Sequence, residues 1–160
     1  MSVTALTVDV SYGQLAVFLS ALQNPFNDWT QKHVDQGFVW RQGSVSFRTL
    51  IESGLHDVEV VLTEQSIPVL DDAIRVIEVP FDIPDDGDIE VSSIADAVSL
   101  SLPSGKYSLR CELLSPRSDG SAQVRITFSK NQKADFKVIR ADEGLTLGDE
   151  LLTSAEVAVI

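Results

Sequence analysis

Two histidines, His33 and His56, and one cysteine are the side chains of this sequence best suited to proton transfer or nucleophilic chemistry near neutral pH. Neither histidine lies in a metal-binding spacing such as HExxH, and the sequence has no GxSxG elbow and no CxxC pair. His56 precedes Asp57, but adjacent strand residues point to opposite faces, so the two do not form a dyad. We therefore predict no catalytic residue and no metal site, and we expect both histidines to be hydrogen-bonded side chains at the surface or at a sheet edge.

The single cysteine, Cys111, shares its alternating register with Leu109 and Leu113. This register predicts a buried, unreactive thiol. One cysteine also means no internal disulfide, which fits a reducing, cytoplasmic location.

A third chemical candidate is the turn Pro84-Asp85-Asp86-Gly87-Asp88, because hard cations favour clustered carboxylates. The spacing does not match an EF-hand loop, which needs ligands at alternate positions and a distal bidentate glutamate. Asp-Gly is typical of a tight hairpin turn, where a positive φ suits glycine. We predict a turn here and no bound cofactor, and keep calcium binding as an alternative.

The acidic residues are concentrated in one third of the sequence. Residues 49–105 contain 13 Asp or Glu and one base, Arg75, whereas the remaining residues carry 11 acids and 11 bases. The formal net charge of −12 therefore belongs to the middle segment. Crowded carboxylates repel one another, and a cationic partner would relieve that repulsion. An acidic face that serves only solubility is the simpler interpretation.

Alternation of apolar and polar residues with period two dominates the sequence and predicts strands. The alternating segments are 3–10, 14–19, 39–49, 57–62, 77–83, 98–102, 107–113 and 124–128. Turn pairs such as Asp86-Gly87, Ser104-Gly105 and Asp119-Gly120 separate the later ones. Many short strands with regular turns favour an all-β fold, a two-layer antiparallel β-sandwich, in a single domain over residues 1–160.

One short helix is predicted within this β pattern. Thr30 is a suitable N-cap, residues 31–36 supply two turns, and Gly37 ends them. Trp29 and Trp40 flank the helix, either covering the sheet or serving as anchors for a protein partner.

The period-two pattern also predicts where the acids lie. The acidic residues on strands fall opposite the apolar positions of their own strands, so they should face solvent. Asp85, Asp86 and Asp88 lie in the turn around Asp86-Gly87. Together they predict a carboxylate-rich sheet face with an acidic hairpin tip, made of Asp57, Glu59, Glu78, Asp82, Asp85, Asp86, Asp88 and Glu90.

Composition excludes several classes of protein. The apolar runs are far shorter than the roughly 20 residues that a membrane helix needs, and no secretory signal pattern opens the sequence. Direct nucleic-acid binding is also not expected, because phosphate contacts need Lys and Arg and this protein is strongly acidic.

Residues 6–110 resemble the competence protein J (ComJ) family, in order and in spacing. The matching blocks are Ser11-Tyr12, Val17-Phe18, Asp28-Trp29-Thr30, Gly37-Phe38, 43–47, Val79-Pro80-Phe81, 89–94 and 102–109. The resemblance fades after Leu114, and the remaining tail is longer than expected of the family. Members of the family are inhibitors of a DNA-entry nuclease that is encoded beside them.

The resemblance implies a non-enzymatic, immunity-type protein that binds a cognate DNase. A DNase must hold a polyanion, so an acidic domain could occupy its cationic groove in place of phosphates. We predict contacts through the eight carboxylates named above, with Trp29 and Trp40 as further candidates. A calcium-dependent or ligand-binding β-sandwich module is the alternative function, and a structural domain with an acidic face is the third.

Overall fold

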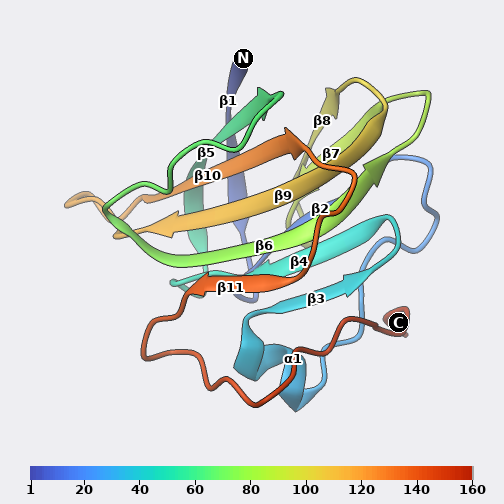
Figure 1. The fold of residues 1–160 in the computed structure, drawn as a ribbon. Coiled ribbons are helices and arrows are strands. Elements are labelled where there is room, and N and C mark those ends of the chain that lie inside the picture. The colour runs from blue at the N-terminus through green and yellow to red at the C-terminus, as the bar shows by residue number, and fades with distance from the viewer. Residues whose placement is uncertain (160) are drawn as a thin grey trace.

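Two β-sheets packed face to face make up the protein (Figure 1). The computed structural model describes residues 1–159. The larger sheet has the strand order β1-β5-β10-β9-β6-β11, and the smaller has the order β3-β4-β2-β7-β8. The strands are β1 (Ser2–Val10), β2 (Gln14–Leu19), β3 (Phe38–Arg41), β4 (Ser44–Arg48), β5 (Gly54–Thr63), β6 (Ala73–Ile83), β7 (Asp88–Ser92), β8 (Ala97–Ser101), β9 (Gly105–Leu114), β10 (Ala122–Lys130) and β11 (Lys137–Arg140).

One continuous core lies between the sheets. Alternate residues of both sheets are fully buried there, including Leu15 and Phe47 from the smaller sheet and Phe81 from the larger. Phe128 meets both Phe81 and Tyr107 edge to face, with centroid separations of 5.9 Å. Alternating strands thus bury one face each, and the predicted all-β sandwich is confirmed.

The predicted helix is α1 (Gln31–Gln36), with Thr30 as its N-cap and Gly37, at φ 90°, as its left-handed C-cap. Its third residue, His33, completes a capping box because its Nδ1 accepts the Thr30 amide at 3.0 Å. Space at Gly37 is also tight, since an added Cβ would lie 2.9 Å from Leu145 Cδ2 and would force that side chain to shift. The left-handed backbone is therefore the main reason for glycine at this position.

The prediction of one strand over 39–49 was wrong. The chain turns at Gln42 and Gly43, where Gly43 has φ 84°, and folds back as the β3–β4 hairpin. Residues 137–140, predicted as tail, form β11 and pair with the edge of β6. Strands β5 and β10 are parallel, so the sheet is not purely antiparallel.

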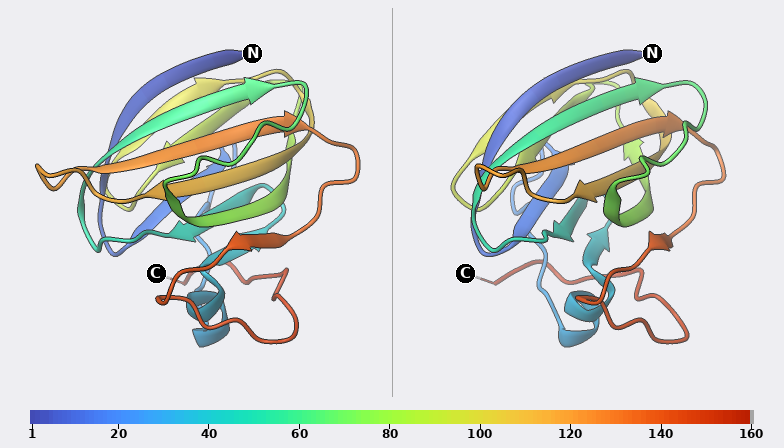
Figure 2. Two further views of the ribbon diagram at one scale, coloured as in Figure 1. Left: turned by 60° about the vertical axis from the view of Figure 1, so that its left-hand side comes forward. Right: turned by 90° about the vertical axis from the view of Figure 1, so that its left-hand side faces the viewer.

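The connection between β5 and β6 crosses the outer face of the larger sheet, since β10 and β9 lie between these two strands. This crossover, residues 64–72, is visible in the two rotated views (Figure 2). No helix within residues 1–159 is long and apolar enough to cross a membrane.

Candidate protein-binding surface

The two histidines are buried rather than exposed. His33 and His56 are 2% and 1% exposed, which corrects the expected surface or edge position. His33 Nε2 lies 2.9 Å from the Ser154 carbonyl oxygen, and His56 Nδ1 lies 2.9 Å from that of Gly54. Both rings bind backbone groups, and the hydroxyl beside His33, that of the N-cap Thr30 at 2.8 Å from Nδ1, also caps the helix. Burial lowers the pKa of His56, outweighing the nearby carboxylates of Asp57 and Asp9.

Cys111 is buried in the core as predicted. Burial raises the pKa of its thiol, so the reactive thiolate is disfavoured. No cluster of three or more His, Cys, Asp or Glu side chains that could hold a metal ion occurs within residues 1–159.

The eight predicted contact carboxylates do not form one continuous face. Asp57 and Glu59 lie on β5 and Glu78 and Asp82 on β6, and two strands separate β5 from β6. The other four lie in the β6–β7 turn and on β7, in the smaller sheet. The predicted acidic sheet face is therefore wrong as a single patch.

Arginines from β9 and β10 neutralise much of the larger sheet's outer face. Arg110 Nε lies 2.9 Å from Glu78 Oε2, and both side chains are nearly buried, at 11% and 12% exposed. Register explains the contact, because Arg110 is directly opposite Glu78 on the neighbouring strand. Glu78 is thus a structural residue beneath the crossover, whose Ile67 carbonyl accepts a bond of 2.6 Å from Arg110 Nη1.

A second pair fixes the same crossover. Arg125 forms two bonds with the fully buried Glu112, at 2.8 and 3.0 Å. Glu112 Oε2 also accepts the Leu70 amide at 2.7 Å, and Arg125 Nη2 donates to the Pro68 carbonyl at 2.8 Å. The sequence pattern placed Glu112 among solvent-facing residues, and no sequence signal indicated that residues 64–72 would cover it.

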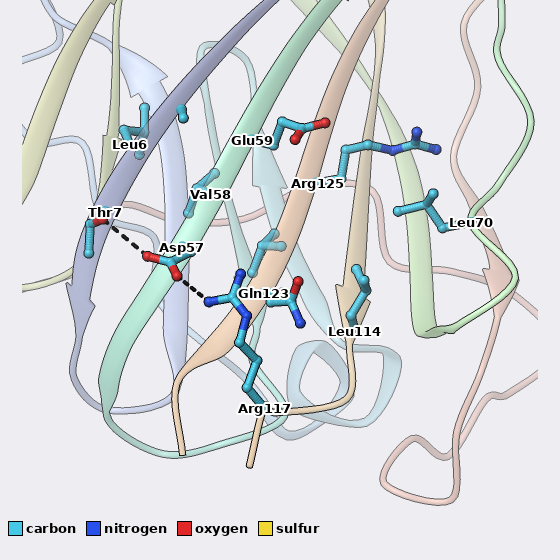
Figure 3. Close-up of a pocket in the computed structure, with 12 residues that line it drawn as sticks. Leu6, Thr7, Asp57, Val58, Glu59, Leu70, Leu114, Arg117, Gln123 and Arg125 are labelled. Carbon is cyan, nitrogen blue, oxygen red and sulfur yellow. Dashed lines mark hydrogen bonds and ion pairs between the residues drawn. The ribbon is translucent and has the colours of Figure 1, made fainter. Parts of the chain in front are cut away.

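Asp57 is also paired, at a cleft of about 440 Å³ between β1, β5 and β10. In Figure 3 its carboxylate lies between Thr7, which donates a hydrogen bond of 3.2 Å, and the Arg117 guanidinium. Hydrogen bonding from Arg117 lowers the pKa of Asp57. The cleft, with Arg125 also on its wall, therefore carries both signs of charge.

Of the eight predicted contact carboxylates, those without an ion pair within residues 1–159 are Glu59, Asp85, Asp86, Asp88 and Glu90. The three aspartates are exposed at the β6–β7 turn, and Asp82 beside them is paired with an exposed Lys106 at 3.5 Å and accepts a hydrogen bond from Gln42 at 3.2 Å. We call Asp82, Asp85, Asp86, Asp88 and Glu90 the acidic tip.

The turn that presents the acidic tip is rigidly built. Gly87 has φ 69°, and a Cβ there would lie 2.3 Å from the Leu102 carbonyl oxygen, so only glycine fits. Asp86 Oδ1 accepts the Asp88 amide at 3.0 Å, and the Leu102 amide donates to Gly87 O at 2.9 Å. The predicted Asp-Gly turn is confirmed.

The two tryptophans have different surroundings. Trp40 donates its indole N–H to the Pro80 carbonyl at 2.8 Å and meets Phe136 edge to face at 4.9 Å. It therefore covers the core as a structural residue. Trp29 is half-buried, donates to Gln14 Oε1 at 3.2 Å, and lines an open groove.

The tail after residue 140 is packed against α1. The Gln36 amide group exchanges two hydrogen bonds with the Leu152 backbone, at 2.9 and 2.8 Å. Buried Arg75 forms two bonds with Asp142, at 2.7 and 2.9 Å, and hydrogen bonding from Arg75 lowers the pKa of Asp142. The tail is thus part of the folded structure.

Comparison with known proteins gives three consistent matches. The family model for competence protein J (ComJ) matches residues 7–135. A curated Bacillus subtilis (strain 168) protein described as a DNA-entry nuclease inhibitor is 27% identical over 105 residues, covering 65% of this chain and 76% of the relative.

The crystal structure of ComJ from Bacillus subtilis, described as an inhibitor of the DNA degrading activity of NucA, has the same fold. The TM-score is 0.69 at 23% identity, over 80% of this chain and 96% of that one. Residues 137–159, with β11 and the packed tail, lie beyond the family match.

Proposed function

Since this chain belongs to the competence protein J (ComJ) family, we propose that it binds a DNase and inhibits it by occupying the enzyme's DNA-binding groove. The match to a relative described as a DNA-entry nuclease inhibitor is the observation that carries this proposal. The protein acts by binding rather than by catalysis, and its partner is a protein rather than DNA.

The acidic tip supports this mechanism. A DNase groove holds phosphates with Lys and Arg, and a fixed array of carboxylates can take the place of those phosphates. Three of the tip aspartates, Asp85, Asp86 and Asp88, are exposed and have no ion pair within the part of the chain that the structure describes. Asp57 and Glu78 already have arginine partners, so they contribute less to the attraction than the tip does.

An inhibition assay tests this function. Increasing amounts of the protein are added to purified NucA of Bacillus subtilis and to the DNase encoded beside this chain's own gene, with plasmid DNA as substrate. We expect cleavage by at least one of the two to stop at a fixed molar ratio of inhibitor to enzyme. Pancreatic-type DNase is the control and should be unaffected.

The protein alone should neither cut plasmid DNA with magnesium nor retard it in a gel, because like charges repel. Unchanged cleavage by both cognate-type DNases at a large excess of the protein would overturn the proposed function.

A further inference from the structure

Three turns meet at one end of the sandwich, opposite the acidic tip along β7. They are the β1–β2 turn, the β4–β5 loop and the β7–β8 turn, and we call residues 9–14, 49–55 and 93–96 the three-turn end. The Gly13 amide donates to Glu52 O at 2.7 Å, and the Thr49 amide donates to Gly13 O at 2.8 Å. These bonds join the first two turns.

Side chains of the β7–β8 turn hold the same β1–β2 turn from the other side. Ser93 Oγ accepts the Ser11 amide at 3.0 Å and donates to Gln14 O at 2.9 Å. The Asp96 carboxylate accepts the Asp9 amide at 2.7 Å. The three turns are therefore one hydrogen-bonded platform.

This platform presents apolar side chains to water. Tyr12 is 75% exposed and has φ 56°, a left-handed conformation that a residue with a bulky side chain rarely adopts. Leu55 and Ile94, from the other two turns, are 58% and 43% exposed. None of these three side chains is part of the hydrophobic core. Packing within the chain therefore does not explain why an aromatic residue occupies a strained turn.

A groove of about 320 Å³ runs beside Tyr12 and is lined by Trp29, Val34 and Arg48 among others. The bond from Trp29 to Gln14 fixes the indole at the groove wall. The Arg48 side chain already has a hydrogen-bond partner within the protein, since its Nη1 donates to the Gly144 carbonyl at 2.8 Å. The groove thus has two aromatic side chains, Tyr12 and Trp29, along its lining.

Carboxylates surround this apolar surface. Asp9 and Glu52 are exposed, and Asp96 is half-buried. The Glu52 carboxylate lies close to Gly13, within 3.2 Å of where a Cβ would be. An apolar centre with an acidic rim fits a partner patch with an apolar centre and a rim of Lys and Arg.

We propose that the three-turn end is the anchoring surface for the DNase, with Tyr12 as its central contact and Trp29 beside it. This inference rests on the proposed function and adds the residues that hold the complex once it has formed. The acidic tip attracts the enzyme at long range and speeds association before it enters the groove, whereas Tyr12 and Trp29 contact the enzyme surface beside the groove and slow dissociation.

Association and dissociation rate constants with the inhibited DNase, immobilised on a sensor surface, test this division. Tyr12→Gly removes the side chain and suits the left-handed backbone, so its melting temperature should equal or exceed that of the parent protein. We expect its dissociation rate to rise at least about tenfold, with association changed less than about twofold. Leu55→Ser should raise the dissociation rate in the same direction.

Ile139→Ala is the matched control, because Ile139 is 41% exposed on β11 and is neither part of the three-turn end nor among the residues that line the groove. Its dissociation rate should stay within about twofold of the parent value. If the parent protein inhibits the DNase and Tyr12→Gly dissociates as slowly as the parent, the anchoring proposal is wrong and the proposed function stands. If the parent protein inhibits neither DNase, the proposed function itself fails.

Discussion

At the scale of single residues, His56 couples stability to pH. Its ring is buried on the inner face of β5, and burial lowers its pKa from the ordinary value of 6.5. In the unfolded chain the ring takes up a proton near pH 6.5, while in the folded protein it does so only at lower pH. The unfolded state therefore binds more protons in this window, and stability falls as the pH drops below about 6.5.

The variant His56→Gln should lose this dependence. It keeps a side-chain amide near the Gly54 carbonyl but has no group that titrates. We expect the free energy of unfolding from urea melts to fall less between pH 7 and pH 5 in the variant than in the parent protein. Identical pH profiles for the two proteins would contradict the assignment of His56 as a buried, uncharged base.

At the scale of elements, ion pairs hold the crossover and the tail on the sandwich. Glu112 bonds both Arg125 and the Leu70 amide and is inaccessible to solvent. Removing one partner of such a pair leaves an uncompensated buried charge, which is costlier than removing both.

Glu112→Met should therefore destabilise the protein by about 3 kcal/mol or more, and the double variant Glu112→Met/Arg125→Met should be less destabilised than the single one. Urea unfolding measures both, and limited proteolysis within residues 64–72 reports release of the crossover. Equal loss in the single and the double variant would mean that charge pairing is not what fixes this segment.

The tail gives a second prediction at this scale. Truncation after Arg140 removes Asp142 and leaves Arg75, which is 3% exposed, without its carboxylate partner. We expect a loss of about 3 kcal/mol or more. Truncation after Glu150 keeps Asp142 and Leu145 and should cost clearly less. Similar stability of both truncated proteins in urea would show that the Arg75–Asp142 pair contributes little.

The strands and the helix differ in how well they could be predicted from the sequence. Period-two alternation identified the long strands, and the capping residues Thr30 and Gly37 placed the helix correctly. The β3–β4 turn was missed because Val39, Val45 and Phe47 continue one alternating pattern through it. Strand β11 was missed because four residues at a sheet edge carry little pattern of their own.

The candidate site was harder to predict, because charge along the sequence differs from charge on the surface. Residues 49–105 are acidic, but register places Arg110 opposite Glu78, and a turn brings Arg117 to Asp57. Such pairing depends on which strands become neighbours. The Asp86-Gly87 turn was predictable because its local sequence determines it. Tyr12 was missed as a surface residue because its exposure follows from three turns meeting in space.

At the scale of the whole molecule, the two surfaces that we propose to act on the DNase lie at opposite ends of β7. The acidic tip lies at the start of β7 and the three-turn end lies beyond its last residue. A net charge of −12 attracts a cationic enzyme from any direction, but only fixed, unpaired carboxylates give that attraction a direction. Salt weakens such attraction, since the Debye length falls from about 10 Å at 0.1 M to about 3 Å at 1 M.

The most direct measurement is the association rate constant with the DNase for two variants of equal charge. Asp85→Asn/Asp86→Asn/Asp88→Asn removes three charges from the tip, and asparagine keeps the oxygen that accepts the Asp88 amide. Glu143→Gln/Asp149→Asn/Glu150→Gln removes three charges from exposed tail positions that have no ion pair within residues 1–159.

At 0.05 M salt we expect the tip variant to associate roughly five- to tenfold more slowly than the parent protein, and the tail variant to change less than about twofold. At 1 M salt the difference between the variants should disappear, because the charges are screened. Equal slowing of both variants at low salt would contradict the account, since net charge alone would then explain the attraction.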